Sequence, residues 1–208
     1  MHPEQEREAL VDRLARRGRI EDEATLAALR SVPRHEFVPE GRREGAYDDR
    51  PLPIGEGQTI SAPHMVGIMT DLLDLRPGDE VLEVGTGCGY HAAVTAEVVG
   101  PGGVYSVEYH ESLAERARRR LERLGYGGIS VRAGDGREGW PEHAPYDRAY
   151  LTCAATDFPR AVVEQVRPGG YLLAPLGTRR QTLVRARRRA DGTLDREEHG
   201  GVRFVTMQ

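Results

Sequence analysis

The residues with the clearest capacity for chemistry form a glycine-rich turn. In VLEVGTGCGY, residues 81–90, an apolar stretch runs into Gly85, Gly87 and Gly89. Such glycines let the backbone turn sharply and approach a ligand closely at the carboxyl end of a first strand. This pattern is typical of a nucleotide-binding site, and we expect Gly85, Thr86, Gly87 and Gly89 to contact the ligand.

The spacing of these glycines argues against a dinucleotide. A G-x-G-x-x-G pattern seats a pyrophosphate on a helix N-terminus, but here Tyr90 occupies the sixth position and the third glycine comes one residue early. Glu83, just before the turn, would repel a diphosphate and favour a cationic ligand. S-adenosylmethionine carries an ammonium and a sulfonium, so the turn favours this cofactor over NAD.

Polar side chains also stand at the ends of the following predicted strands. Glu108 ends VYSVE and is suited to accept hydrogen bonds from ribose hydroxyls, whereas the Asp135 carboxylate, beside Gly136, is suited to accept from an adenine amino group. Thr152 closes the fourth strand. Each residue alone has a plainer explanation: Glu108 as a solvated strand end, Asp135-Gly136 as a turn, and Glu83 as a helix-dipole partner. Together, at successive strand ends, they predict one ligand crevice.

The elements that would position these residues alternate between strands and helices. Apolar spacing predicts helices near 4–17 and 26–32, an extended surface segment over 33–58, and a helix beginning at Ser61. It then predicts strands at 80–84, 104–108, 129–132, 147–152 and 171–175, with helices at 90–99, 111–124 and 158–166. The fold class is therefore α/β, a doubly wound, mostly parallel Rossmann-like sheet.

Two further strands, at 182–187 and 202–205 with a turn at Asp191-Gly192, predict an antiparallel edge to this sheet. The basic run RARRR at 185–189 is interpreted as an edge strand protected by charge. We expect residues 1–60 to form N-terminal helices and an extended segment that pack on a cofactor-binding domain over residues 61–208.

Composition excludes several classes of function. The formal net charge of -4 argues against a nucleic-acid-binding protein. The sequence contains no lysine, which excludes a lysine nucleophile and a Walker phosphate loop. Cys88 and Cys153 are far apart and predict neither a disulfide framework nor a metal site. No apolar run approaches the roughly 20 residues of a membrane span. We expect a soluble, cytoplasmic protein that does not associate with membranes, and a monomer.

Four stretches carry a resemblance to a known family. They are AYDDRPLPIGEGQTISAPHM at 46–65, VLEVGTGCGYHAA at 81–93, AGDGREGWPEHAPYD at 133–147 and VRPGGYLLAPLG at 166–177. With them, the chain resembles the protein-L-isoaspartate O-methyltransferase family. Methyltransferases in general share the second and fourth stretches, whereas the first separates this family from other users of the fold.

The resemblance implies an enzyme that methylates the free α-carboxylate of L-isoaspartyl residues in damaged proteins and peptides, as a first step of repair. It implies S-adenosylmethionine as cofactor, with S-adenosylhomocysteine as product. By position it places Ser61 at the active site, and residues 62–65 over the cofactor, which His64 would contact. Ser61 precedes Ala-Pro and is also a good candidate for a helix N-cap, so both roles remain open.

Other functions remain as alternatives. A methyltransferase for a small molecule or for another protein group would lack the QTISAPHM segment, and a nucleic-acid methyltransferase would carry an Asn/Asp-Pro-Pro-Tyr motif where TCAA stands here. An NAD-dependent oxidoreductase is opposed by the glycine spacing. A cofactor-binding regulator without catalysis would bind the cofactor and methylate no isoaspartyl peptide.

Overall fold

The fold is built around a seven-stranded sheet in the order β5-β4-β3-β6-β7-β8-β9. The computed structural model describes residues 2–100 and 102–208. The parallel strands are β3 (Val81–Val84), β4 (Val104–Glu108), β5 (Ser130–Ala133), β6 (Tyr146–Leu151) and β7 (Val166–Leu176). The strand order reverses at β3, which pairs with β4 on one side and with β6 on the other. The predicted doubly wound sheet is confirmed, and its switch point lies beside the glycine turn.

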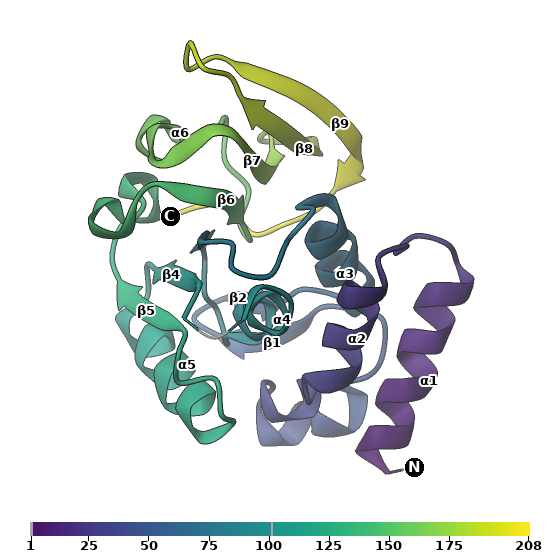
Figure 1. Ribbon diagram of the computed structural model, residues 1–208. Helices are drawn as coiled ribbons and strands as arrows, with labels where there is room; N and C mark the ends of the chain where they lie inside the picture. The colour runs from purple at the N-terminus through teal and green to yellow at the C-terminus, as the bar shows by residue number, and fades with distance from the viewer. Residues whose placement is uncertain (1, 101) are drawn as a thin grey trace.

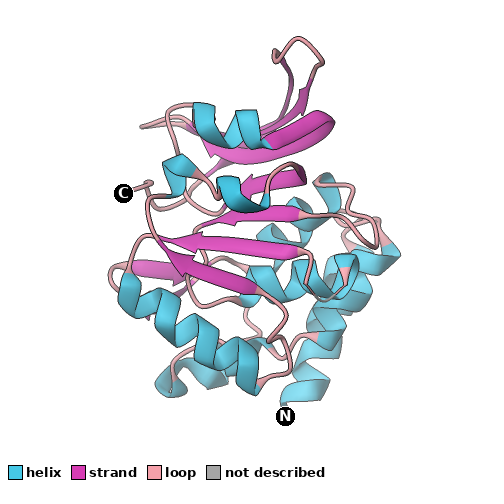
Figure 2. Ribbon diagram, turned by 60° about the vertical axis from the view of Figure 1, so that its left-hand side comes forward, coloured by secondary structure: helices cyan, strands magenta, loops and turns pink. Residues whose placement is uncertain are grey.

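The buried strands of the sheet carry apolar side chains on both faces, and helices cover both faces. One hydrophobic cluster contains Val81 with side chains of α3 (Pro63–Leu72), α4 (Tyr90–Val99) and α5 (Glu111–Arg123). The other contains Leu82 with side chains of α6 (Arg160–Gln165). Figure 2 shows the strands side by side with helices packed around them.

The N-terminal helices extend the first cluster. α1 (Pro3–Arg16) and α2 (Glu23–Ser31) lie outside α4, and α2 packs directly on it (Figure 1). Leu10, Leu14 and Leu29 belong to the same cluster as Val94 of α4. This packing buries α4 almost all round, which explains why its sequence is apolar without a polar face.

The segment over 33–58 differs from the extended surface segment predicted for it. It contains two short 3-10 helices, η1 (Arg34–Glu36) and η2 (Glu40–Gly45), and an antiparallel hairpin of β1 (Leu52–Gly55) and β2 (Gln58–Ile60). Arg34 is fully buried, with its guanidinium 4.9 Å from the Tyr90 ring centroid and its Nε donating to the carbonyl of Ala46 at 2.8 Å. This buried arginine ties the segment to the body of the fold.

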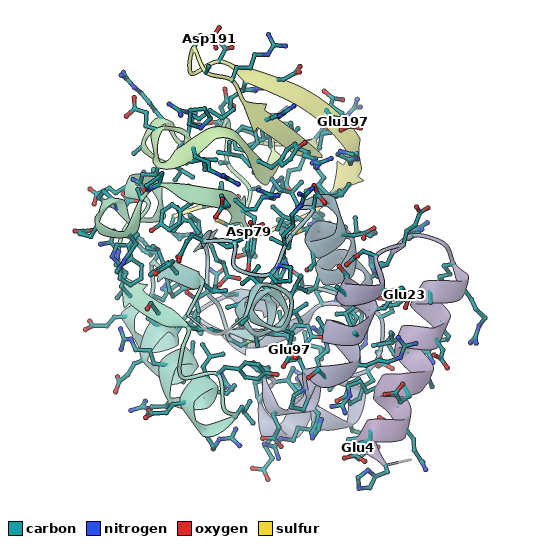
Figure 3. The ribbon with its side chains drawn as sticks, in the orientation of Figure 1. Glu4, Glu23, Asp79, Glu97, Asp191 and Glu197 are labelled. Carbon is teal, nitrogen blue, oxygen red and sulfur yellow. The ribbon has the colours of Figure 1, made fainter. Side chains whose placement is uncertain are left out.

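The predicted antiparallel C-terminal edge of the sheet is confirmed, but the position of its last strand differs. β8 (Gln181–Arg188) and β9 (Leu194–Val202) are antiparallel, but β9 lies earlier in the chain than the predicted strand at 202–205. The edge of the sheet is β9, so the basic strand β8 is an inner strand. Acidic residues of β9 lie opposite some arginines of β8, as in Glu197 opposite Arg185, and the Arg185 guanidinium also lies 3.9 Å from the centroid of the Tyr171 ring. Figure 3 shows Asp191 at the tip of this hairpin and Glu197 along β9.

Two smaller differences concern helices. α6 begins only after Pro159, and β7 starts directly behind it at Val166, so the helix is shorter and the strand longer than predicted. Among the described residues, none of the helices combines the length and the hydropathy of a membrane span.

Candidate active site

A pocket opens at the carboxyl ends of β3, β4 and β6, where the strand order reverses. It brings together many of the residues predicted from sequence, namely Ser61, Gly85, Thr86, Gly87, Glu108, Gly136 and Thr152. These residues come from segments far apart in the chain, and the parallel strands carry them to one edge of the sheet. The crevice outside a switch point is where α/β sheets bind ligands.

The glycine turn has a backbone that only glycine adopts readily. Gly85, Gly87 and Gly89 have φ angles of 100°, 56° and 88°. A Cβ atom on Gly85 would lie 2.3 Å from Oγ1 of Thr152, which donates a hydrogen bond to the Gly85 carbonyl at 2.5 Å. The turn therefore packs directly against the end of β6.

Glu108 is the carboxylate on the wall of this pocket. Its side chain is held in place because Oε2 accepts from the Gly87 N–H at 2.7 Å and Oε1 accepts from the His110 N–H at 3.0 Å. A carboxylate has about four lone-pair sites. Two of them remain for further donors, so Glu108 is able to bind a pair of hydroxyl groups.

Glu83 does not face the pocket, in contrast to the prediction. Its side chain is fully buried and does not line the pocket: Ser106 Oγ lies 2.5 Å from its carboxyl group and Tyr150 donates to it at 2.9 Å. Complete burial raises the pKa of Glu83 to about 8. The side chain is therefore mainly neutral at pH 7, and it supports the turn through Ser106 and Thr86.

Three other predicted residues also lie outside the pocket wall. Gly89 is the N-cap of α4 and packs towards Leu121, since a Cβ atom there would lie 3.2 Å from that side chain. Asp135 turns its carboxylate to the backbone N–H of Arg137 at 2.9 Å, so it caps the short helix η3 (Gly136–Glu138). His64 lies in the groove described next.

Ser61 lies where this pocket meets a wider groove. The groove is lined by residues of α3, of the β7–β8 turn and of the segment that follows β9, including His64 and Met65. Both spaces share Thr59, Ser61, Thr152, Val205 and Thr206. A ligand in the pocket and a second molecule in the groove would therefore meet beside Ser61 and Thr152.

The side chain of Ser61 is half-buried and caps no helix. The N-cap of α3 is Ala62, which places Ser61 one residue before the cap and corrects the predicted N-cap role. Within residues 2–100 and 102–208, no hydrogen bond involves the Ser61 hydroxyl. His64 is instead fixed, because its Nδ1 lies 2.7 Å from Oδ1 of Asp49.

Comparison with known proteins identifies the family. Residues 5–208 match the sequence model of the protein-L-isoaspartate(D-aspartate) O-methyltransferase family. The chain belongs to this family. Among relatives, it is 51% identical to protein-L-isoaspartate O-methyltransferase 2 of Archaeoglobus fulgidus, over 100% of this chain and 95% of that one. It is 52% identical to the Methanopyrus kandleri enzyme, over 97% and 90% of the two chains.

Solved structures agree with this assignment. One protein-L-isoaspartate O-methyltransferase superposes with a TM-score of 0.87 at 32% identity, over 96% of this chain and 65% of that chain. A second, from Plasmodium falciparum, was solved with S-adenosyl-L-homocysteine and superposes with a TM-score of 0.81 over 97% of this chain and 98% of that chain. Its identity is 22%, so it supports the fold alone.

Several pocket residues of this methyltransferase carried no sequence signal that we used. Tyr109 and His110 follow Glu108 and line the pocket, and their position directly behind the predicted acidic residue could have indicated them. Residues 205–208 also line it, held by hydrogen bonds from the Ala154 N–H to the Val205 carbonyl at 2.7 Å and from the Met207 N–H to the Ala154 carbonyl at 2.9 Å. This contact joins distant segments, so no local pattern reports it.

The two cysteines near the pocket are poor nucleophiles. Burial raises the pKa of the Cys153 thiol to about 12 and also raises the pKa of Cys88. Both thiols therefore stay protonated at neutral pH. Across the described ranges, no cluster of three or more histidine, cysteine, aspartate or glutamate side chains could hold a metal ion.

Proposed function

We propose that this chain transfers the methyl group of S-adenosylmethionine to the free α-carboxylate of L-isoaspartyl residues in damaged proteins and peptides, which begins their repair. Family membership supports the reaction and the cofactor. The observation that carries the assignment to this site is the junction of pocket and groove at Ser61 and Thr152. A reaction between two bound molecules needs such a junction.

The pocket fits the cofactor in its polar and apolar parts. Glu108 has free lone pairs on the pocket wall for the ribose hydroxyls. Tyr109 is a largely exposed aromatic residue on the same wall and offers a flat face for an adenine ring. Gly85, Thr86, Gly87, Gly136 and Thr152 would supply the remaining wall. Asp135 is a positioning residue, because it fixes the turn that carries Gly136.

Glu83 and Gly89 would also act indirectly. Glu83 holds Ser106, whose hydroxyl lies 2.5 Å from Oγ1 of Thr86 in the pocket. Gly89 starts α4 in a left-handed conformation and so ends the turn. His64 would contact the substrate in the groove rather than the cofactor, since Asp49 fixes its ring beside Ser61.

The substrate needs orientation more than activation. The bound cofactor supplies an electrophilic methyl group on a sulfonium. An α-carboxylate has a pKa of about 3.5 and is ionised at neutral pH, so no base has to remove a proton. We assign Ser61 the role of holding one carboxylate oxygen by donating a hydrogen bond. Holding the reacting groups in line accounts for several kcal/mol of barrier reduction in such reactions.

Methyl transfer to matched peptides tests this function. The wild-type chain is incubated with radiolabelled S-adenosylmethionine and one peptide made in two versions, with isoaspartate or aspartate at the same position. We expect label to enter the isoaspartyl version alone. Cofactor binding without transfer to either version would leave a cofactor-binding protein and overturn the proposed reaction.

We also propose that the enzyme acts as a cytoplasmic monomer without a nucleic-acid partner. Pocket and groove are both built from one chain, both cysteines are free thiols, and the formal net charge is -4. A reducing compartment suits free thiols, and a net negative charge disfavours phosphate backbones. Sedimentation at micromolar concentration tests the oligomeric state, and a dimer would contradict it.

A further inference from the structure

Arginines without acidic partners line the groove beside Ser61. Arg179 and Arg180 lie in the turn between β7 and β8, and Arg203 follows β9. All three side chains are exposed, and none forms an ion pair within the described ranges. By contrast, Arg189 pairs with Asp195 at 3.2 Å and Arg196 pairs with Asp157 at 2.7 Å.

No carboxylate on the groove wall neutralises these charges. The wall contains no aspartate or glutamate among the described residues. His64, on the α3 part of the groove wall, is held by Asp49, whose other oxygen already pairs with Arg17 at 3.2 Å. The groove is therefore a positively charged surface on a chain whose formal net charge is -4.

The groove is continuous with the position assigned to the substrate carboxylate. Ser61 and Thr152 belong to the walls of both spaces. A peptide whose isoaspartyl α-carboxylate reaches Ser61 leaves the reaction centre through this groove, since the pocket is filled by the cofactor. Residues that flank the isoaspartate then pass the exposed guanidinium groups.

We propose that Arg179, Arg180 and Arg203 make this enzyme prefer isoaspartyl sites flanked by aspartate or glutamate. This proposal rests on the proposed function. Guanidinium groups bind carboxylates through paired N–H donors, and a positive groove also speeds the approach of an acidic segment. A basic flank meets repulsion from the same groups. Isoaspartyl sites in acidic surface loops are the substrate class that fits this charge.

Peptides that differ in one flanking position test the preference. Each carries isoaspartate with glutamate, glutamine or arginine beside it, and kcat/KM is measured for all three. An exposed ion pair changes an equilibrium only by roughly twofold to fivefold. We therefore expect the glutamate peptide to exceed the glutamine peptide by about threefold, with the arginine peptide slowest. The preference should shrink in 1 M salt, where the Debye length is about 3 Å.

Variants locate the effect. The double variant Arg179→Gln with Arg180→Gln, and separately Arg203→Gln, should reduce the ratio of kcat/KM for the glutamate and arginine peptides. Arg19→Gln is the matched control, because Arg19 is exposed, lines neither space and has no ion pair in the described structure. Its ratio should equal that of the wild type. Melting curves check that all variants fold.

The outcomes separate this proposal from the proposed function. Equal kcat/KM for the three peptides, with the glutamine peptide methylated well, would overturn the flank preference and leave the function standing. An equal loss on all three peptides in the arginine variants would assign these residues to the isoaspartyl carboxylate itself and overturn the flank preference as well. No methylation of any peptide by the wild type would overturn both.

Discussion

Ser61 is the residue on which the proposed chemistry depends most. Its hydroxyl is half-buried at the junction of pocket and groove, and no helix end uses it. We predict that Ser61→Ala lowers kcat/KM on an isoaspartyl peptide at least about tenfold, the equivalent of about 1.4 kcal/mol, and leaves the melting temperature unchanged. Initial rates and a thermal melt measure both quantities.

Ser61→Asp provides the complementary variant. It would place a carboxylate against the substrate carboxylate, so methyl transfer should collapse while cofactor binding persists. Near-normal rates in either variant would move the substrate carboxylate away from Ser61. A lower melting temperature in Ser61→Ala would show that the Ser61 hydroxyl contributes to the stability of the fold.

The pKa of Glu83 predicts a pH dependence of stability. In the folded protein Glu83 has a pKa of about 8 and keeps its proton up to about that pH. An ordinary glutamate has a pKa of 4.5 and loses its proton at lower pH. The free energy of unfolding of the wild type therefore falls as pH rises from 4.5 to 8, because the folded state holds this proton more tightly than the unfolded chain does. Glu83→Gln has no such proton, so its free energy of unfolding should fall less over this range.

Urea unfolding at about pH 5 and pH 8 measures this difference. We expect the wild type to lose more stability than Glu83→Gln by at least about 1.4 kcal/mol, the equivalent of one pKa unit. The buried His91, whose pKa is lowered to about 3 by burial, contributes equally to both proteins. Equal losses in the two proteins would mean that Glu83 is ionised in the folded state.

At the scale of elements, the turn from β3 to α4 is the part least able to accept a side chain. Gly85 has a φ of 100°, and a Cβ atom there would lie 2.3 Å from Oγ1 of Thr152. We predict that Gly85→Ala weakens S-adenosylhomocysteine binding about tenfold or more, because the turn and Thr152 must separate. Isothermal titration measures the affinity.

Gly78→Ala is the control for this variant. Gly78 also has a positive φ, 87°, but nothing lies within 4 Å of the added Cβ atom, and the residue lines neither space. It should lose stability through backbone strain and retain cofactor affinity. Equal affinities for Gly85→Ala and the wild type would remove the turn from the cofactor site.

Several elements could be predicted from local sequence patterns alone. The predicted helix at 90–99 and strand at 104–108 coincide with α4 and β4, because their apolar runs and flanking glycines are local signals. Glu108 was predicted at the pocket for the same reason, as the end of a strand. The complete burial of Glu83 was not, since its carboxyl group is held by Ser106 and Tyr150 from two other strands, and no local pattern reports such contacts.

The parts that sequence patterns missed depend on distant contacts. The segment over 33–58 folds into short elements around the buried Arg34, and a charged residue in the sequence normally indicates surface. β8 becomes an inner strand only because the acidic β9 pairs with it. Residues 205–208 reach the pocket through backbone hydrogen bonds to Ala154.

At the scale of the whole molecule, the N-terminal elements and the sheet share one core. Residues 1–60 were expected to pack on a domain over residues 61–208, and Leu10 and Leu29 lie in the same hydrophobic cluster as Val94 and Leu173. We predict that calorimetry shows one cooperative transition. S-adenosylhomocysteine at about a hundred times its Kd should stabilise this transition by about 2.7 kcal/mol.

A separate early transition would contradict this view. It would show that the N-terminal elements unfold on their own and that β1, β2 and Ser61 depend on them only weakly. The same experiment with Arg34→Met tests how much the buried Arg34 contributes to this cooperativity, since the variant loses the hydrogen bond to the Ala46 carbonyl. A lower melting temperature without splitting of the transition is the expected result.

The position of the transferred methyl group tests the central claim most directly. A peptide with one isoaspartate, one aspartate and one glutamate is incubated with the wild-type enzyme and S-adenosylmethionine, and mass spectrometry locates the product ester. We predict a single methyl ester on the α-carboxylate of the isoaspartyl residue. Methylation of the aspartate or glutamate side chain, or no ester despite cofactor binding, would contradict the account.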